Sequence, residues 1–265
     1  MKNSLFSLFI FFFLSCEEVE IDDLLSDFST DNTPVTTILT VDTLFESSSV
    51  VLNWTGNEYS TAFSYRLEPL SYADTVKTYT NWSDWDTLNT VTLTNLDDGN
   101  YTFYIKSRFT VENEEAVQSI YFTVDAITGS SLRMYPLYQR VSPGETFSTY
   151  LYIEDVVDLA GVELHLSYPF SNVSTNSITP GEVLSNSSIF FDIQNFTDGS
   201  IELISTVSDS RGYNGTGPIA KINFTAGESA GLDTLHIKET SILRTSLNVP
   251  IDILGRVYGL IDIVN

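Results

Sequence analysis

Two histidines, His165 and His236, are the residues of this sequence best suited to proton transfer or metal binding. Each lies between apolar neighbours in a segment where apolar and polar residues alternate. Alternation places each imidazole on the strand face opposite those neighbours. Two histidines without cysteine ligands do not complete a structural zinc site unless carboxylates contribute. We therefore predict no metal site and no cofactor.

Motifs of nucleophilic or metal-dependent hydrolysis do not occur in the sequence. There is no Gly-x-Ser-x-Gly elbow and no His-Glu-x-x-His pair. The glycine-bearing segment 212–217 lacks the lysine of a phosphate-binding loop and precedes a predicted strand. With 35 acidic residues, composition leaves a glycosidase-type carboxylate pair open, but neither half of the chain resembles a hydrolase. We predict that the protein is not an enzyme.

The excess of acidic residues limits which kinds of molecule the protein can bind. The 35 acidic residues outnumber 12 basic ones and give a net charge of -23. No basic stripe exists that would neutralise phosphates, which excludes nucleic acid as a partner. The same charge argues against adsorption on anionic lipid head groups. Solubility and resistance to self-association are the simplest consequences of such acidity.

Residues 1–16 predict a lipid anchor. Lys2, the apolar run 5–14 and a small residue form a secretory signal that is too short to span a bilayer. The only cysteine, Cys16, has no disulfide partner. The segment 13–16 (Phe-Leu-Ser-Cys) resembles a bacterial lipobox, although phenylalanine stands where leucine is usual. This resemblance implies lipidation at Cys16; an ordinary signal peptide is the alternative.

An acidic tether is predicted over residues 17–33. It begins Glu-Glu-Val-Glu-Ile-Asp-Asp and contains no basic residue, so it should stay extended and solvated. Its first residues also resemble the surface-export signal of Bacteroidetes lipoproteins, with a generic linker as the alternative. That resemblance implies a protein anchored in the bacterial outer membrane and exposed on the cell surface.

From Thr36 onward, alternating apolar residues and frequent turn signals predict an all-β chain. No stretch shows sustained helical periodicity. The segment 128–131 (Thr-Gly-Ser-Ser) interrupts two strand-rich regions. We predict two tandem β-sandwiches, one at residues 34–126 and one at residues 131–265.

The first predicted sandwich has an aromatic core. Val50, Leu52 and Trp54 alternate toward its interior, and Tyr101 opens a strand directly after a turn. A tyrosine at such a corner caps backbone groups with its hydroxyl while its ring packs inward. With the run 63–67 (Phe-Ser-Tyr-Arg-Leu), these features resemble fibronectin type III and related immunoglobulin-like domains.

Trp82 and Trp85 of this region could have either of two roles. An exposed indole offers a flat apolar face on which a sugar can stack. Packing against the core or an edge of the sandwich is the more common fate of tryptophan. The sequence leaves both open.

Ordered motifs mark the second region. They are Pro-Gly-Glu-Thr-Phe at 143–147, Asp-Leu-Ala-Gly at 158–161 before a strand ending in Ser-Tyr, and Gly-x-Gly at 215–217. In this order they resemble the cohesin family, although Pro169 replaces the usual aspartate. The resemblance implies a nine-stranded jelly roll that binds a dockerin-type protein module or a carbohydrate, in association with extracellular polysaccharide breakdown. The chain has no dockerin-type calcium loop, so it would be the receptor.

The alternation of apolar and polar residues, together with the resemblance to cohesins, predicts a ligand-binding face. The apolar phase of residues 162–168 points inward, and so do Leu235 and Ile237. In cohesins the corresponding strands form one sheet. The resemblance thus implies one exposed face with Glu163, His165, Asp192, Glu202, His236 and Lys238. The alternative is a solvated sheet without a partner, in a protein that acts as a structural or adhesive surface spacer.

Overall fold

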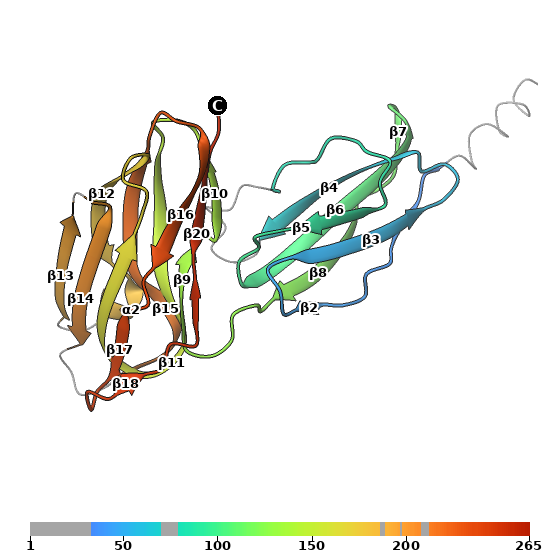
Figure 1. Cartoon of the computed structure of the whole chain (residues 1–265). Coiled ribbons are helices and arrows are strands. Elements are labelled where there is room, and N and C mark those ends of the chain that lie inside the picture. The colour runs from blue at the N-terminus through green and yellow to red at the C-terminus, as the bar shows by residue number, and fades with distance from the viewer. Residues whose placement is uncertain (1–32, 70–78, 186–188, 197, 208–211) are drawn as a thin grey trace, which may run out of the picture.

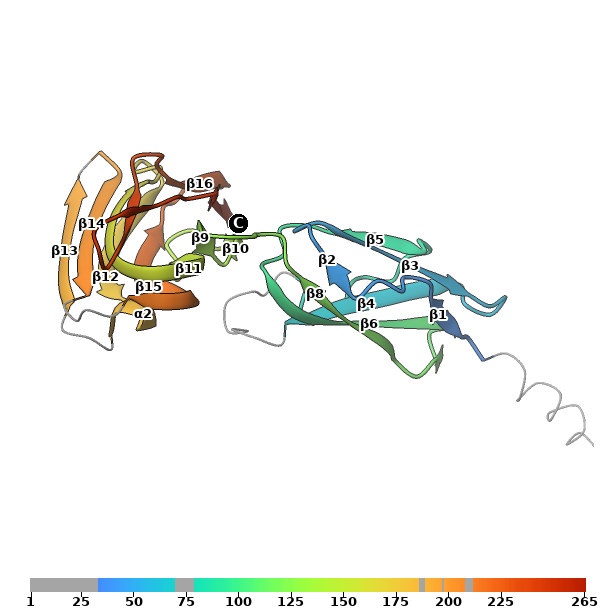
Figure 2. The same cartoon turned by 90° about the horizontal axis from the view of Figure 1, so that it is seen from below.

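The computed structural model describes residues 33–69, 79–185, 189–196, 198–207 and 212–265. Cys16 and nearly all of the predicted tether lie outside these residues. Within them the chain is built of strands, apart from the single-turn helix α2 (Glu182–Ser185). The strands form two bodies that lie end to end (Figure 1, Figure 2). No helix in the described part is long and apolar enough to cross a membrane.

The N-terminal body consists of two facing sheets. One sheet contains β1 (Thr36–Ile38), β3 (Val50–Gly56) and β5 (Thr90–Leu93). The other contains β2 (Leu44–Phe45), β4 (Ala62–Pro69), β6 (Gly99–Thr110), β7 (Asn113–Glu114) and β8 (Gln118–Val124). Apolar side chains of both sheets meet in one hydrophobic cluster. This burial is what holds the two sheets together.

The core of this body matches the alternation of the sequence. Val50, Leu52 and Trp54 are all buried, as predicted. Tyr101 is also buried, and its hydroxyl donates a 2.8 Å hydrogen bond to the backbone oxygen of Asp97. The predicted cap at this corner is therefore confirmed. Burial raises the pKa of the Tyr101 hydroxyl well above its usual value, which keeps it a neutral donor.

The C-terminal body contains twelve strand segments among the described residues rather than nine, because short pieces count separately. They are β9 (Ser131–Tyr135), β10 (Tyr138–Val141), β11 (Thr146–Ser167), β12 (Val173–Pro180), β13 (Ile189–Phe196), β14 (Ser200–Val207), β15 (Tyr213–Ala226), β16 (Gly231–Ile237), β17 (Ile242–Thr245), β18 (Pro250–Ile251), β19 (Gly255–Val257) and β20 (Gly259–Ile263). A second hydrophobic cluster fills this body.

Strand β11 joins the two layers of this sandwich. Its first half pairs with β9 and β15, and its second half pairs with β14, β16 and β17. Between the halves lie two register shifts, and Asp155 and Asp158 have φ angles of 46° and 60°. Such bulges bend a strand sharply. One 22-residue strand thus serves both sheets.

The beginning and end of the C-terminal body run side by side. Strand β9 pairs in parallel with β19, and β10 pairs in parallel with β20. The paired positions extend from Ser131 opposite Gly255 to Val141 opposite Ile263. The strands are far apart in sequence, so these ladders close the domain.

A buried ionic cluster lies where the two bodies meet. Arg133 of β9 contacts Glu154 of β11, and its Nη1 lies 3.5 Å from Oδ1 of Asp97 in the N-terminal body. The same Asp97 oxygen accepts a 2.8 Å hydrogen bond from the N–H of Leu137. The carboxylate of Asp98 accepts hydrogen bonds from the N–H groups at 126 and 127. These contacts connect the two bodies directly.

Candidate functional site

The candidate site is the outer face of the sheet formed by β16, β11, β14 and β13, which are neighbours in that order. Val162, Leu164 and Leu166 of β11 and Tyr168 directly after it are all buried, as the alternation predicted. On β16 the inward residues Leu235 and Ile237 are buried as well. The intervening residues therefore project outward.

Strand register brings the six predicted residues onto this outer face. His165 lies directly opposite Glu202, and Glu163 lies opposite Ile204, which in turn pairs with Asp192 of β13. His236 lies opposite Ser167, and the N–H of Lys238 donates a 2.8 Å bond to the oxygen of His165. Opposed residues of paired strands share a face. All six positions consequently lie on one surface that spans four strands.

The centre of the outer face is a polar depression of about 270 Å³ lined by His165, Asp198, Ser200, Ile201, Glu202 and Lys238. Nε2 of His165 lies 3.1 Å from Oε1 of Glu163, and these side chains are 26% and 45% exposed. Nζ of Lys238 donates a 3.2 Å hydrogen bond to Oγ of Ser200. Acidic groups therefore dominate this surface, with one lysine near its middle.

Aromatic residues that the sequence analysis did not select flank these charges. Phe190 of β13 is 59% exposed and shares the outward phase of Asp192. Tyr258 is 41% exposed, and its ring centroid lies 4.5 Å from that of His236. The spacing of two from Asp192 was a usable signal for Phe190. Tyr258 precedes β20 and carried no such signal.

Trp82 and Trp85 lie on the N-terminal body in a ladder of alternating rings and cations. The ring centroid of Trp82 lies 5.5 Å from Cζ of Arg66 and 5.0 Å from Nζ of Lys106. That of Trp85 lies 5.1 Å from Nζ of Lys106 and 4.4 Å from Cζ of Arg108. Cation–π contacts therefore occupy both rings. This geometry favours the packing interpretation over an open sugar platform.

Comparison with known proteins identifies the class of the C-terminal body. Residues 139–254 match the family model of the cohesin domain. The matched segment is similar to cohesin domains, and it includes most of the outer face. No curated protein matches the chain.

Solved cohesin structures are similar to this chain at low identity. The non-cellulosomal cohesin of the archaeon Archaeoglobus fulgidus is 16% identical, with a TM-score of 0.44 over 52% of this chain and 93% of that one. The sixth cohesin of Acetivibrio cellulolyticus scaffoldin B, solved with a Cel5 dockerin, is 19% identical, with a TM-score of 0.46 over 52% and 100%. The cohesin of a type I cohesin–dockerin complex from Clostridium thermocellum is 12% identical to this chain. Its TM-score is 0.46, over 52% of this chain and 100% of that one.

Proposed function

We propose that the C-terminal cohesin domain is a non-catalytic receptor that binds a dockerin-type protein module through its outer face. The observation that carries this proposal is the cohesin match over residues 139–254. Two of the similar cohesin structures were solved in complex with dockerins. Such a receptor would hold polysaccharide-degrading enzymes outside the cell.

The composition of the outer face supports a protein partner. Protein interfaces combine a few aromatic anchors with a polar rim. Phe190 and Tyr258 are exposed aromatics beside the polar residues Asp192, His236 and Lys238. Exposed aromatic side chains beside charged ones suit a folded protein partner.

Truncating an aromatic anchor should weaken dockerin binding. We expect Phe190→Ala and Tyr258→Ala each to cost about 1–2 kcal/mol of binding free energy, roughly 5- to 30-fold in Kd. Tyr121→Ala is the matched control, because Tyr121 is 49% exposed but lies on the N-terminal body. Dockerin modules from the same organism would be titrated one by one by calorimetry against the full chain.

Three outcomes would contradict the docking proposal. If the control weakens binding as much as the face variants, the outer face is not the contact surface. If no dockerin binds and a glycan array retains the chain, a carbohydrate replaces the protein partner. If neither binds, the structural or adhesive spacer becomes the better interpretation.

For the N-terminal body we propose a fibronectin type III-like sandwich that spaces the cohesin domain from the membrane. A three-stranded sheet faces a larger one, and Tyr101 caps the turn before β6. The proposed domain boundaries remain residues 34–126 and 131–265. The ion pair of Asp97 with Arg133 and the hydrogen bond that Asp97 accepts from the N–H of Leu137 would keep this spacer in a fixed orientation.

We further propose that the protein is anchored in the bacterial outer membrane by lipidation of Cys16 and faces outward. The support is the lipobox-like segment 13–16 and the acidic residues that follow it. Because an acyl chain supplies the membrane affinity, Cys16→Ser should move the protein from the detergent phase to the soluble fraction. Detergent phase partitioning of bacterial cells that express the protein measures its share in each phase.

Replacing Glu17 and Glu18 by Gln is the control, because this change should leave the protein in the detergent phase. Membrane retention of Cys16→Ser would refute the anchor.

A further inference from the structure

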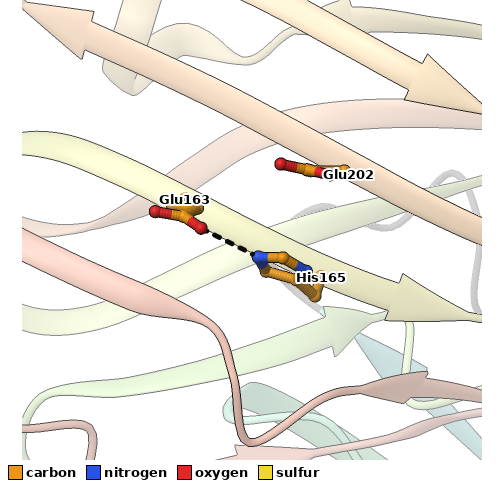
Figure 3. Close-up of side chains that lie close together, drawn as sticks. All are labelled: Glu163, His165 and Glu202. Carbon is orange, nitrogen blue, oxygen red and sulfur yellow. Dashed lines mark hydrogen bonds and ion pairs between the residues drawn. The ribbon is translucent and has the colours of Figure 1, made fainter.

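Three potential metal ligands come together near the middle of the outer face. Figure 3 shows Glu163 and His165 projecting side by side from β11, with Glu202 beside them on β14. Glu163 and His165 share a face because they are two residues apart, and Glu202 is the cross-strand partner of His165. One carboxylate oxygen from each glutamate and one ring nitrogen of His165 all lie within 4.8 Å of one another.

This donor set suits a divalent transition metal. Zn²⁺ binds nitrogen and oxygen donors at about 2.0–2.2 Å in a tetrahedron, which places adjacent donors about 3.3–3.6 Å apart. Nε2 of His165 and Oε1 of Glu163 already lie 3.1 Å apart. An imidazole ligand favours Zn²⁺ over Ca²⁺ or Mg²⁺, which prefer oxygen alone. We infer that Glu163, His165 and Glu202 bind one Zn²⁺ ion whose fourth coordination position faces solvent.

The electrostatics of the cluster are consistent with a bound cation. Two carboxylates at short range repel each other, and a doubly charged ion removes that repulsion. The nearby cation Lys238 makes its hydrogen bond to Ser200. No hydrogen bond or ion pair to another described residue engages the Glu202 carboxylate. Its charge is therefore available to a ligand.

The backbone beneath the cluster is firmly held. Leu164 and Leu203 pair across β11 and β14, and both are fully buried in the core. Side chains on paired strands over a packed core keep their spacing better than side chains on loops. The three ligands therefore need only side-chain rotation to close around an ion.

The sequence predicts no metal site, and our inference departs from that prediction. Two histidines need help from carboxylates to complete a metal site. Glu163 was visible two positions from His165. Glu202 becomes a neighbour only through the antiparallel register of β11 and β14, which links residues 37 positions apart (202 − 165).

Calorimetric titration of Zn²⁺ into the full chain, purified in detergent without a polyhistidine tag, tests the inference. We expect one ion per chain. His165→Ala and Glu202→Gln should each weaken binding by at least about tenfold, since each removes a ligand. His236→Ala is the matched control: His236 lies on the same outer face but outside the cluster, so the affinity should not change. Lys238→Gln should tighten binding, because it removes a like charge from the same depression.

Co²⁺ supplies a second readout, because its visible absorption reports nitrogen and carboxylate coordination directly. The spectrum of wild-type protein should be lost in His165→Ala and kept in His236→Ala. If His165→Ala retains the stoichiometry and affinity of wild type, or if wild type binds many Zn²⁺ ions weakly, the metal is adventitious and the inference fails. The experiment contains no dockerin, so its failure leaves the docking proposal intact, and the reverse also holds.

Discussion

Replacing Arg133 by methionine should destabilise the C-terminal body by about 3–5 kcal/mol, because removing one partner leaves buried charge uncompensated. The Arg133 side chain is only 6% exposed. Its guanidinium donates to Glu154, contacts Asp97, and lies 4.7 Å from the ring centroid of Tyr152. Methionine fills a similar volume but provides no charge for these carboxylates. Chemical unfolding of the full chain, followed by circular dichroism, measures the loss.

The control for this prediction is Arg140→Met. Arg140 forms an ion pair with Asp262, but its side chain is 59% exposed. Exposed pairs contribute about 0–1 kcal/mol because water screens them. A loss of similar size in both variants would mean that burial of the Arg133 cluster does not determine its contribution.

The same cluster gives the stability a pH dependence with a defined sign. Burial raises the pKa of Asp97 from 3.8 to about 7, although Arg133 and the N–H of Leu137 oppose the rise. Between these values the folded protein holds the proton more tightly than the unfolded chain, so stability falls as pH rises through this window. Arg133→Met removes an opposing charge. The fall should therefore extend to higher pH in the variant than in wild type.

Replacing Trp54 by alanine should destabilise the N-terminal body by about 3–5 kcal/mol, through lost burial and the cavity left behind. Trp54 is 2% exposed, and its ring centroid lies within about 6 Å of those of Phe63, Tyr65 and Phe103. Circular dichroism should record a lower transition midpoint for this body. Trp54→Phe should cost less, because the indole N–H is buried without a hydrogen-bond partner among the described residues.

Trp82→Ala provides the matched tryptophan control for Trp54→Ala. Trp82 is 38% exposed and contacts Arg66 and Lys106 through its ring faces. Its loss should cost on the order of 1 kcal/mol, since exposed cation–π contacts contribute little. Equal destabilisation by the two alanine variants would show that the aromatic cluster around Trp54 is not the core of this body.

Much of the fold could be predicted from the sequence because it is local. The alternation of residues 162–168 determines which side chains point inward, and the same holds around Trp54. The tyrosine corner at Tyr101 depends on a turn only a few residues away. The fold class and the inward-facing residues of the main strands could therefore be predicted without knowing which strands pair.

The unpredicted features depend on contacts between distant segments. Arginine and aspartate are usually found on protein surfaces. Arg133 and Asp97 are nevertheless buried, at the junction between the two bodies. The bend in β11 rests on Asp155 and Asp158 in left-handed backbone conformations, which aspartate adopts more readily than most residues. The sequence in this segment is typical of two strands. Likewise, Tyr258 is placed on the outer face by its ring contact with His236 of a different strand.

The parallel ladders of β9 with β19 and β10 with β20 have a mechanical consequence. A pull that separates Ser131 from the far end of β20 drags parallel strands past each other lengthwise. The hydrogen bonds of both ladders then carry the load together, whereas antiparallel strands pulled from one end would open one bond at a time. A load applied between these two ends therefore acts on both ladders in shear.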